Sequence, residues 1–155
     1  MDLTFNVEDY KLNVRAAGII IHNDKILLHR NFNSNHYALL GGRVEIGEDS
    51  ESTVIREILE ETGKQVELNG YIATVENFFK IEDTKYHEIL FVHKAEFKND
   101  QDKKILDTLK NIEGKEYLQY EWIDIDKIDE YPLKPDIMKK VIKEKNFPTH
   151  VINKD

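Results

Sequence analysis

Residues 41–63, GGRVEIGEDSESTVIREILEETG, predict a helix between two glycine turns. The helix contains both apolar and acidic residues. Asp49 or Ser50 can cap the start of this helix, and Gly63 stands where a helix C-cap glycine belongs. The apolar residues between these caps recur at helical spacing and predict a buried stripe on a helix of about three and a half turns: Val54, Ile55, Ile58 and Leu59. Such a stripe must pack on a second element, and we expect a sheet to supply that surface.

The rest of the chain is predicted to be richer in strands than in helices. Two apolar, β-branched runs are separated by the polar turn 22–24 and predict a hairpin, and two longer β-rich runs meet at the polar turn 82–84. The predicted strands are 14–21, 25–29, 36–40, 66–80, 86–97 and 117–123, the later helical segments are 126–130 and 134–145, and a charged loop covers 101–116. This order predicts an α+β or layered α/β fold, and the length predicts one domain over residues 1–155.

Composition and charge exclude several classes of protein. The net charge of −8 disfavours general nucleic-acid binding, which needs clustered Lys and Arg for phosphate contacts. The chain has no cysteine, so disulfides, zinc–thiolate sites and cysteine nucleophiles are excluded. No apolar run approaches the roughly 20 residues that cross a bilayer, and the first residues lack the pattern of a signal peptide. We therefore expect a cytoplasmic protein with no membrane partner.

Acidic residues of the predicted helix share one side of it. Glu57, Glu60 and Glu61 are spaced i, i+3 and i+4, so their side chains are expected to project together. Three convergent carboxylates are a suitable ligand set for a hard divalent cation such as Mg²⁺ or Mn²⁺, and Mg²⁺ commonly binds carboxylates together with substrate phosphates. The alternative is a solvated acidic face, which is common on Glu-rich helices. Spacing alone leaves both interpretations open.

Residues around the helix favour the metal-binding interpretation. The Gly41-Gly42 turn lets the backbone approach closely or adopt a positive φ, so a main-chain carbonyl can be brought to a metal ion. Arg56 lies beside Glu57, and Glu48 lies upstream in the same polar patch. A partly buried Arg–Glu pair at this place would orient a catalytic carboxylate.

At these spacings the segment resembles the Nudix box, which reads glycine, five residues, glutamate, seven residues, then Arg-Glu-apolar-x-Glu-Glu-x-Gly. The matching residues are Gly42, Glu48, Arg56, Glu57, Ile58, Glu60, Glu61 and Gly63. Lys64 departs from the pattern because the family usually has an apolar residue there, and Leu40 stands where a proline is frequent. The resemblance to this MutT-like family implies the Nudix fold, a mixed β-sheet flanked by helices in an α/β/α sandwich.

The resemblance also implies roles for the box residues. The implied metal ligands are the main-chain carbonyl of Gly41 and the side chains of Glu57, Glu60 and Glu61. The implied catalytic residues are Glu57, Glu60, Arg56 and Glu48, of which the last two orient the cluster. The cofactor, Mg²⁺ or Mn²⁺, would neutralise the diphosphate oxygens and lower the pKa of a bound water. Either Glu57 or Glu60 would take the proton of that water, or a residue from a loop outside the box would do so.

Residues outside the box are candidates for further contacts. Nudix enzymes of the triphosphate-cleaving type often place another metal-binding glutamate near a late strand, and the spacing favours Glu116, with Glu121 next. The alternative is that both are ordinary loop and strand-edge charges. The candidate substrate contacts are Arg43, followed by Arg30 and Arg15, for phosphates, Phe78 or Phe79 for stacking on a nucleobase, and His87 as a phosphate contact or proton donor.

The resemblance implies metal-dependent hydrolysis of the diphosphate linkage of a nucleoside diphosphate derivative. The favoured substrate is a nucleoside triphosphate or a modified form of one, and the alternative substrates are ADP-ribose or another nucleotide sugar. A Nudix-fold sensor that binds a nucleotide without cleaving it is the rival from a different class. The expected partner is thus a small-molecule nucleotide and not a nucleic acid, and the resemblance also allows a homodimer.

Overall fold

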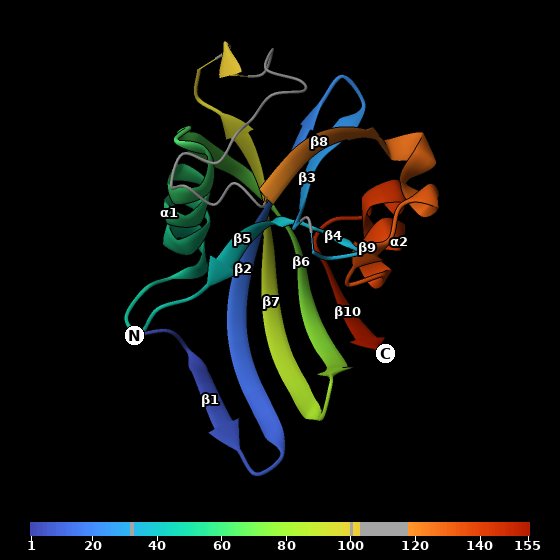
Figure 1. The fold of residues 1–155 in the computed structure, drawn as a ribbon. Helices are drawn as coiled ribbons and strands as arrows, with labels where there is room; N and C mark the ends of the chain where they lie inside the picture. Colours follow the sequence, from blue (N-terminus) through green and yellow to red (C-terminus); the bar gives the residue numbers. More distant parts are fainter. Residues whose placement is uncertain (32, 100, 103–117) are drawn as a thin grey trace.

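A computed structural model describes residues 1–31, 33–99, 101–102 and 118–155 (Figure 1). Its strands are β1 (Thr4–Val7), β2 (Tyr10–His22), β3 (Lys25–Asn31), β4 (Tyr37–Ala38), β5 (Leu40–Arg43), β6 (Val66–Ile81), β7 (Thr84–Phe97), β8 (Leu118–Asp124), β9 (Leu133–Lys134) and β10 (Thr149–Lys154). Its helices are α1 (Ser50–Thr62), the 3₁₀ helix η2 (Ile125–Glu130) and α2 (Ile137–Glu144). Within these described ranges, every helix is too short or too polar to cross a membrane.

The described strands form one mixed sheet. Its main path is β10-β6-β7-β2-β3-β4-β9, with β1 and β5 paired to β2 and β8 paired to β3. The pairs β2–β7 and β10–β6 are parallel, whereas β6 and β7 are antiparallel. The long strands β2, β6 and β7 extend beyond both α-helices (Figure 1). The expected α+β architecture, a mixed sheet flanked by helices, is confirmed.

The two faces of the sheet carry separate hydrophobic clusters. On one face, Val54 and Ile58 of α1 pack over β2, and the cluster includes Ala16 and Ile20. A Cβ atom at Gly18 would lie 2.9 Å from Val54 Cγ1, so the glycine lets the helix approach closely. On the other face, α2 and η2 cover a second cluster. Its β2 residues, Ala17 and Ile19, alternate along the strand with those of the first cluster. Figure 1 shows α1 and α2 on opposite sides of the sheet.

Capping interactions define both ends of α1. The Asp49 carboxylate accepts a hydrogen bond from the Ser52 N–H at 2.7 Å, as an N-cap residue does. Gly63 has a φ of 71°, in the left-handed region, and its N–H donates to the Leu59 carbonyl. The predicted C-cap is therefore confirmed, and Asp49 is the residue that caps the N-terminus.

The apolar stripe of α1 is narrower than the periodicity predicts. Val54 and Ile58 are fully buried, but Ile55 is 40% exposed and Leu59 is 42% exposed. The remaining buried residues of the helix are Thr53, Glu61 and Thr62. A single sheet face covers only the residues nearest to it, so the expectation that Ile55 and Leu59 are buried is wrong.

Several other elements differ from the expectation. Neither β1 nor β10 is predicted from the sequence, because both are short and pair with long strands, β1 with the neighbouring β2 and β10 with the distant β6. The expected strand 36–40 is split at Leu39 into β4 and β5. The last helix begins at Ile137 and not at residue 134, because Lys134 belongs to β9 and Pro135 follows it. Most of the expected loop 101–116 lies outside the described residues.

Replacing Ile58 by Ala should lower the free energy of unfolding by about 2–4 kcal/mol, because the change leaves a cavity between α1 and the sheet. The matched control, Ile55→Ala on the exposed side of the same helix, should lower it by less than about 1 kcal/mol. Chemical denaturation monitored by circular dichroism measures both values. Equal losses in the two variants would contradict the packing described for α1.

Candidate active site

Arg56 is the centre of a hydrogen-bonded cluster on α1, and all five of its N–H donors are used. Nε and Nη2 donate to the two carboxylate oxygens of Glu48 at 2.8 and 2.9 Å. Nη1 donates to Glu57 at 2.8 Å and to Glu60 at 3.4 Å. Nη2 also donates to the main-chain carbonyl of Arg43 at 3.2 Å, which ties α1 to β5. Arg56, Glu48, Glu57 and Glu60 are called the acidic cluster below.

Both carboxylate oxygens of Glu48 accept hydrogen bonds. Besides Arg56, it accepts hydrogen bonds from the Thr53 hydroxyl at 2.6 Å and from the Glu45 N–H at 3.2 Å. The hydrogen bonds from Arg56 are the main cause that lowers the pKa of Glu48 to about 2. Glu48, followed by Glu57, in turn raises the pKa of the Arg56 guanidinium. The Arg56–Glu48 pair is therefore a fixed ion pair near neutral pH and suits the orienting role that the resemblance implies.

Gly42 makes room for the Glu57 carboxylate. A Cβ atom at Gly42 would lie 2.3 Å from Glu57 Cδ and 2.5 and 2.6 Å from its two oxygens. The side chain of Glu57 thus occupies the space that any other residue at position 42 would fill. Gly41 is constrained by its own strand pair, because a Cβ there would lie 2.1 Å from the Ala16 carbonyl oxygen of β2. The adjacent glycines Gly41 and Gly42 therefore allow β5 to approach both β2 and α1 closely.

The three acids of the predicted ligand set lie in different environments. Glu57 is held by Arg56 under Gly42, and the Glu60 side chain is 44% exposed. Glu61 is 6% exposed and belongs to the buried face of α1. Arg56 brings Glu57 and Glu60 together by donating to both carboxylates. Within the described ranges, no group of three His, Asp or Glu side chains is arranged to hold a metal ion.

A pocket with a volume of about 470 Å³ lies on the face of the sheet opposite to α1. Its floor is formed by inward-facing residues of β2, β6 and β7, and its rim includes His36, Pro135 and Asp155. Ala17 and Leu90 line its inner end and also belong to the hydrophobic cluster under α2. The pocket therefore begins where the α2-side core ends, along the parts of the strands that the helix does not cover.

Cationic side chains line this pocket, although the protein carries a net charge of −8. They are Arg15, Arg43, Lys80 and Lys134. Arg15 and Arg43 are register partners on β2 and β5, and Arg43 also lies 3.8 Å from Asp2. The Arg43 side chain lines the pocket while its carbonyl accepts a hydrogen bond from Arg56. The strand β5 therefore connects the cationic pocket on one face with the acidic cluster on the other.

The structure separates the candidate substrate contacts into two groups. Arg43 and Phe79 line the pocket. Successive residues of a strand point to opposite faces, so Phe78 points away from it. His87 contacts Phe78 with ring centroids 4.5 Å apart, and neither residue lines the pocket. Of the two phenylalanines, Phe79 is therefore the one placed to meet a ligand there.

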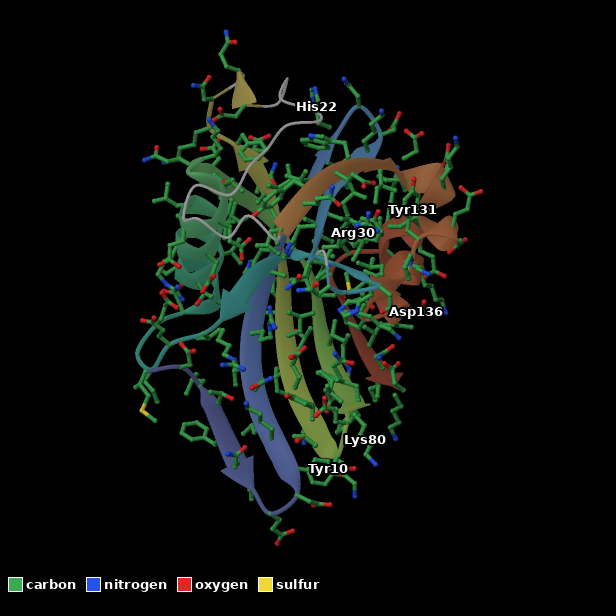
Figure 2. The ribbon with its side chains drawn as sticks, in the orientation of Figure 1. Tyr10, His22, Arg30, Lys80, Tyr131 and Asp136 are labelled. Carbon is green, nitrogen blue, oxygen red and sulfur yellow. The ribbon has the colours of Figure 1, made fainter. Side chains whose placement is uncertain are left out.

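Arg30 and Glu121 lie together, away from the acidic cluster. Both carboxylate oxygens of Glu121 accept from the Tyr37 hydroxyl at 3.2 Å, and the Arg30 guanidinium lies 5.3 Å from the centre of the same ring. Burial, with the charge of Glu121 next, raises the pKa of Tyr37. Figure 2 shows Arg30 close to β8 and Lys80 near the far end of β6. Glu116 lies outside the described residues, so the metal-binding roles of Glu116 and Glu121 stay predictions.

The pocket residues that the sequence reasoning does not single out include Asn13, Asn77, Tyr86 and Glu88. Asn77 and Glu88 are polar, yet they occupy inward-facing positions of β6 and β7. The other inward-facing positions of these strands are mostly apolar. A polar residue at an inward position of a strand is the signal that could have identified them.

Comparisons with known proteins agree with the geometry. A family model described as NUDIX domain matches residues 12–144. Among solved structures, a MutT protein from Bacillus halodurans has a TM-score of 0.65 at 21% identity, covering 90% of this chain and 85% of that chain. An ADP-ribose pyrophosphatase from Streptococcus suis has a TM-score of 0.56 at 16% identity, covering 90% and 98%. A UDP-X diphosphatase has a TM-score of 0.64 at 20% identity, covering 91% of this chain and 66% of that chain. These structures share the fold.

The low pKa of Glu48 predicts how stability depends on pH. The folded-state pKa of about 2 lies below the ordinary value of 4.5, so the stabilisation is complete above pH 4.5 and is lost as the pH falls towards 2. In the presence of EDTA, wild type should exceed Glu48→Gln in unfolding free energy by about 2–3 kcal/mol near neutral pH. The difference should shrink as the pH falls below 4.5, as measured by urea denaturation. The exposed neighbour variant Glu51→Gln serves as control, and a difference independent of pH would refute the assignment.

Proposed function

This chain belongs to the NUDIX domain family and is a Nudix hydrolase, and on this premise we propose that it hydrolyses the diphosphate linkage of a nucleotide, with a nucleoside triphosphate or a modified triphosphate as the favoured substrate. The observation that carries the proposal is the arrangement around β5. On one side of this strand lies the acidic cluster, and on the other lies a pocket rimmed by Arg15 and Arg43. In this proposal the enzyme acts in the cytoplasm on a small molecule.

The residues of the box fit a divalent metal ion, which Nudix hydrolases generally use. Glu57 and Glu60 offer hard carboxylate oxygens, and Mg²⁺ in proteins commonly takes one or two carboxylates together with waters and substrate phosphates. Glu57 also has a space of its own under Gly42. In the proposal, Glu57 and Glu60 hold Mg²⁺ or Mn²⁺ together with the Gly41 carbonyl, and Glu61 is the further ligand implied by the family. When bound, the ion supplies neutralisation of phosphate charge and a water of lowered pKa.

The different contacts of Glu57 and Glu60 support different tasks for them. Glu57 receives a 2.8 Å hydrogen bond from Arg56, which fixes the direction of its carboxylate and suits a constant ligand position. Glu60 receives a longer, 3.4 Å hydrogen bond and is more exposed, so its carboxylate has more freedom to turn towards a water. We therefore assign proton abstraction to Glu60 in preference to Glu57. Arg56 and Glu48 act as positioning residues.

The pocket supplies the contacts that a nucleotide needs beyond the box. Arg43 and Arg15 offer guanidinium groups that can bind phosphate oxygens bidentately. Phe79 lies farther along the same face and offers an aromatic surface for a base. The phosphates would then lie at the edge of β5, between the cationic pocket and the acidic cluster.

A nucleotide sugar or ADP-ribose is the second candidate substrate. The names of two structural relatives, a UDP-X diphosphatase and an ADP-ribose pyrophosphatase, refer to such substrates. A sensor without catalysis is disfavoured, because every acidic and basic position of the box is retained.

A panel of nucleotides tests the proposal. The four common nucleoside triphosphates, oxidised and methylated forms, ADP-ribose and UDP-glucose are incubated with the protein and Mg²⁺ or Mn²⁺, and products are identified by chromatography and mass spectrometry. We expect metal-dependent release of a nucleoside monophosphate or diphosphate from the triphosphates. Binding of nucleotides without any product would favour the sensor instead.

Replacing Glu60 by Gln should lower kcat by at least about 100-fold, because the side chain loses its negative charge and its ability to accept a proton. The unfolding free energy should change by less than about 1 kcal/mol, since Glu60 is exposed. Glu51→Gln, an exposed acid in the first turn of the same helix, should keep wild-type turnover. Unchanged turnover in the Glu60 variant would remove this residue from the catalytic set.

Replacing Gly42 by Ala should displace the Glu57 carboxylate, because the new methyl group would overlap it. Misplacement of a ligand by about 1 Å can cost about 100-fold in rate, so we expect kcat to fall by about 10- to 100-fold. The protein should stay folded, because the clash involves the end of a side chain. Gly70→Ala, at a glycine of β6 outside the site, is the control for a general effect of removing a glycine, and kinetics with matched circular dichroism spectra compare the two. Full activity of the Gly42 variant would show that Glu57 need not occupy this place.

A further inference from the structure

A row of four buried polar residues crosses the sheet at one register, and three of them, Asn13, Asn77 and Glu88, line the pocket. Asn13 on β2 pairs with Glu88 on β7, Glu88 pairs with Asn77 on β6, and Asn77 pairs with Asn153 on β10. All four residues are between 3% and 7% exposed. Such a row is unusual in a sheet face that otherwise carries a hydrophobic cluster, because each buried polar group needs a hydrogen-bond partner. We call Asn13, Glu88, Asn77 and Asn153 the polar row.

Hydrogen bonds orient the amides of the polar row. The Asn153 amide nitrogen donates to the Asn77 carbonyl oxygen at 2.9 Å, and the Asn77 amide nitrogen donates to Glu88 Oε1 at 3.3 Å. At the other end of the row, the Thr4 hydroxyl donates to the Asn13 carbonyl oxygen at 2.6 Å. The amide nitrogen of Asn77 is thus turned towards Glu88, and the amide nitrogen of Asn13 is the end that stays available for a further partner.

The polar row keeps unused hydrogen-bonding capacity where it lines the pocket. Within the described residues, Glu88 receives one side-chain hydrogen bond, from Asn77, and has no ion-pair partner. The Asn13 amide nitrogen has no hydrogen-bond partner among the same residues. Burying a carboxylate with so few hydrogen-bond donors costs free energy. A ligand that supplies N–H groups to this carboxylate offsets that cost. The floor of the pocket thus presents a carboxylate flanked on both sides by amide donors.

An aromatic pair adjoins the polar row on the same face. Phe79 and Tyr86 are register partners, with ring centroids 4.7 Å apart and an angle of 6° between the ring planes, and both line the pocket. Each lies two residues from a member of the row, because Asn77 precedes Phe79 on β6 and Glu88 follows Tyr86 on β7. A flat, nitrogen-containing ring could contact this aromatic surface while its edge meets the carboxylate.

From this arrangement we infer that the pocket binds a guanine base, whose adjacent N1–H and N2–H groups donate to the two oxygens of Glu88. The inference rests on the proposed function, because it names the substrate class of the same site. An amide N–H of Asn77 or Asn13 donates to the O6 carbonyl of the base, and Phe79 and Tyr86 provide the apolar surface. Two parallel N–H···O⁻ bonds to one carboxylate are the strongest form of this contact.

Other bases match the polar row less well. Uracil and thymine present a single N–H between two carbonyls, so they offer only one donor to the two oxygens of Glu88. Adenine and cytosine present a ring nitrogen that accepts hydrogen bonds next to their amino group, and this acceptor would face the carboxylate. A site that is built to bond a donor discriminates strongly against an analogue that lacks it.

The spacing between the polar row and the two arginines of the pocket suits a nucleotide. Asn13 and Arg15 are two residues apart on β2 and face the same side, which places them about 7 Å apart along the strand. Arg15 pairs with Arg43, and Arg43 connects to the acidic cluster through its carbonyl. A base on the polar row would therefore leave room for a ribose before its phosphates reach the two arginines.

Binding without hydrolysis tests the inference. In EDTA, titration calorimetry with GDP, IDP, ADP, UDP and CDP should show GDP binding at least about 10-fold more tightly than each of the others. IDP is the decisive probe, because it lacks only the 2-amino group that would donate to Glu88. Glu88→Gln should weaken GDP binding by about 10-fold or more and leave ADP binding nearly unchanged. The control Glu76→Gln lies on the outward face of β6 next to Asn77, where Glu76 bonds His150, and should bind as wild type does.

The outcomes separate this inference from the proposed function. Equal binding of GDP and IDP, or tighter binding of ADP, UDP or a nucleotide sugar, would overturn the guanine assignment even if hydrolysis is observed. Selective GDP binding with no metal-dependent product from any nucleotide would uphold the assignment and overturn the proposed hydrolysis. The comparison of GDP with IDP uses the wild-type protein, so it decides the question even if Glu88→Gln does not fold.

Discussion

The donors of Arg56 hold together carboxylates that would otherwise repel one another. Glu57 and Glu60 are on the same helix, and Glu48 precedes it, so the three negative charges are close because of the fold. One guanidinium offers five N–H groups in a plane, which a lysine could not match. The same group also bonds the Arg43 carbonyl, so the charge cluster and the docking of α1 on β5 depend on one side chain.

The strand β5 is the second constraint, because it must approach both α1 and β2 without side chains in the way. Gly42 leaves space for Glu57, and Gly41 fits against the backbone of β2. The next residue, Arg43, has its side chain in the pocket and its carbonyl on Arg56. A strand of four residues thus joins two faces of the sheet that have opposite charge.

The sequence predicts best those features that depend on neighbours along the chain. The cap at Gly63 and a polar patch that contains Arg56, Glu57 and Glu48 are predicted from residues 41–63, and the structure contains both. Helical periodicity indicates the buried side of α1 but not its width, which the sheet decides, so Ile55 is exposed. The polar row could not be predicted, because it depends on the register of strands that are far apart in sequence, as Asn13 with Glu88 and Asn77 with Asn153.

The box residues are close in sequence and the pocket residues are not, so substitutions in the two places would have different effects on the choice of substrate. The proposed bond-breaking residues lie within one short segment, where each residue depends on the others through Arg56, so a substitution there affects the whole cluster. The pocket residues lie on separate strands and would meet the proposed nucleotide from the opposite face of the sheet. Among the described residues, the side-chain hydrogen bond of Glu88 is with Asn77 and those of Arg56 to other side chains are with Glu48, Glu57 and Glu60, so the proposed contacts of a base could change while the acidic cluster keeps its hydrogen bonds. Two proteins could therefore share the box and the fold and still act on different nucleotides.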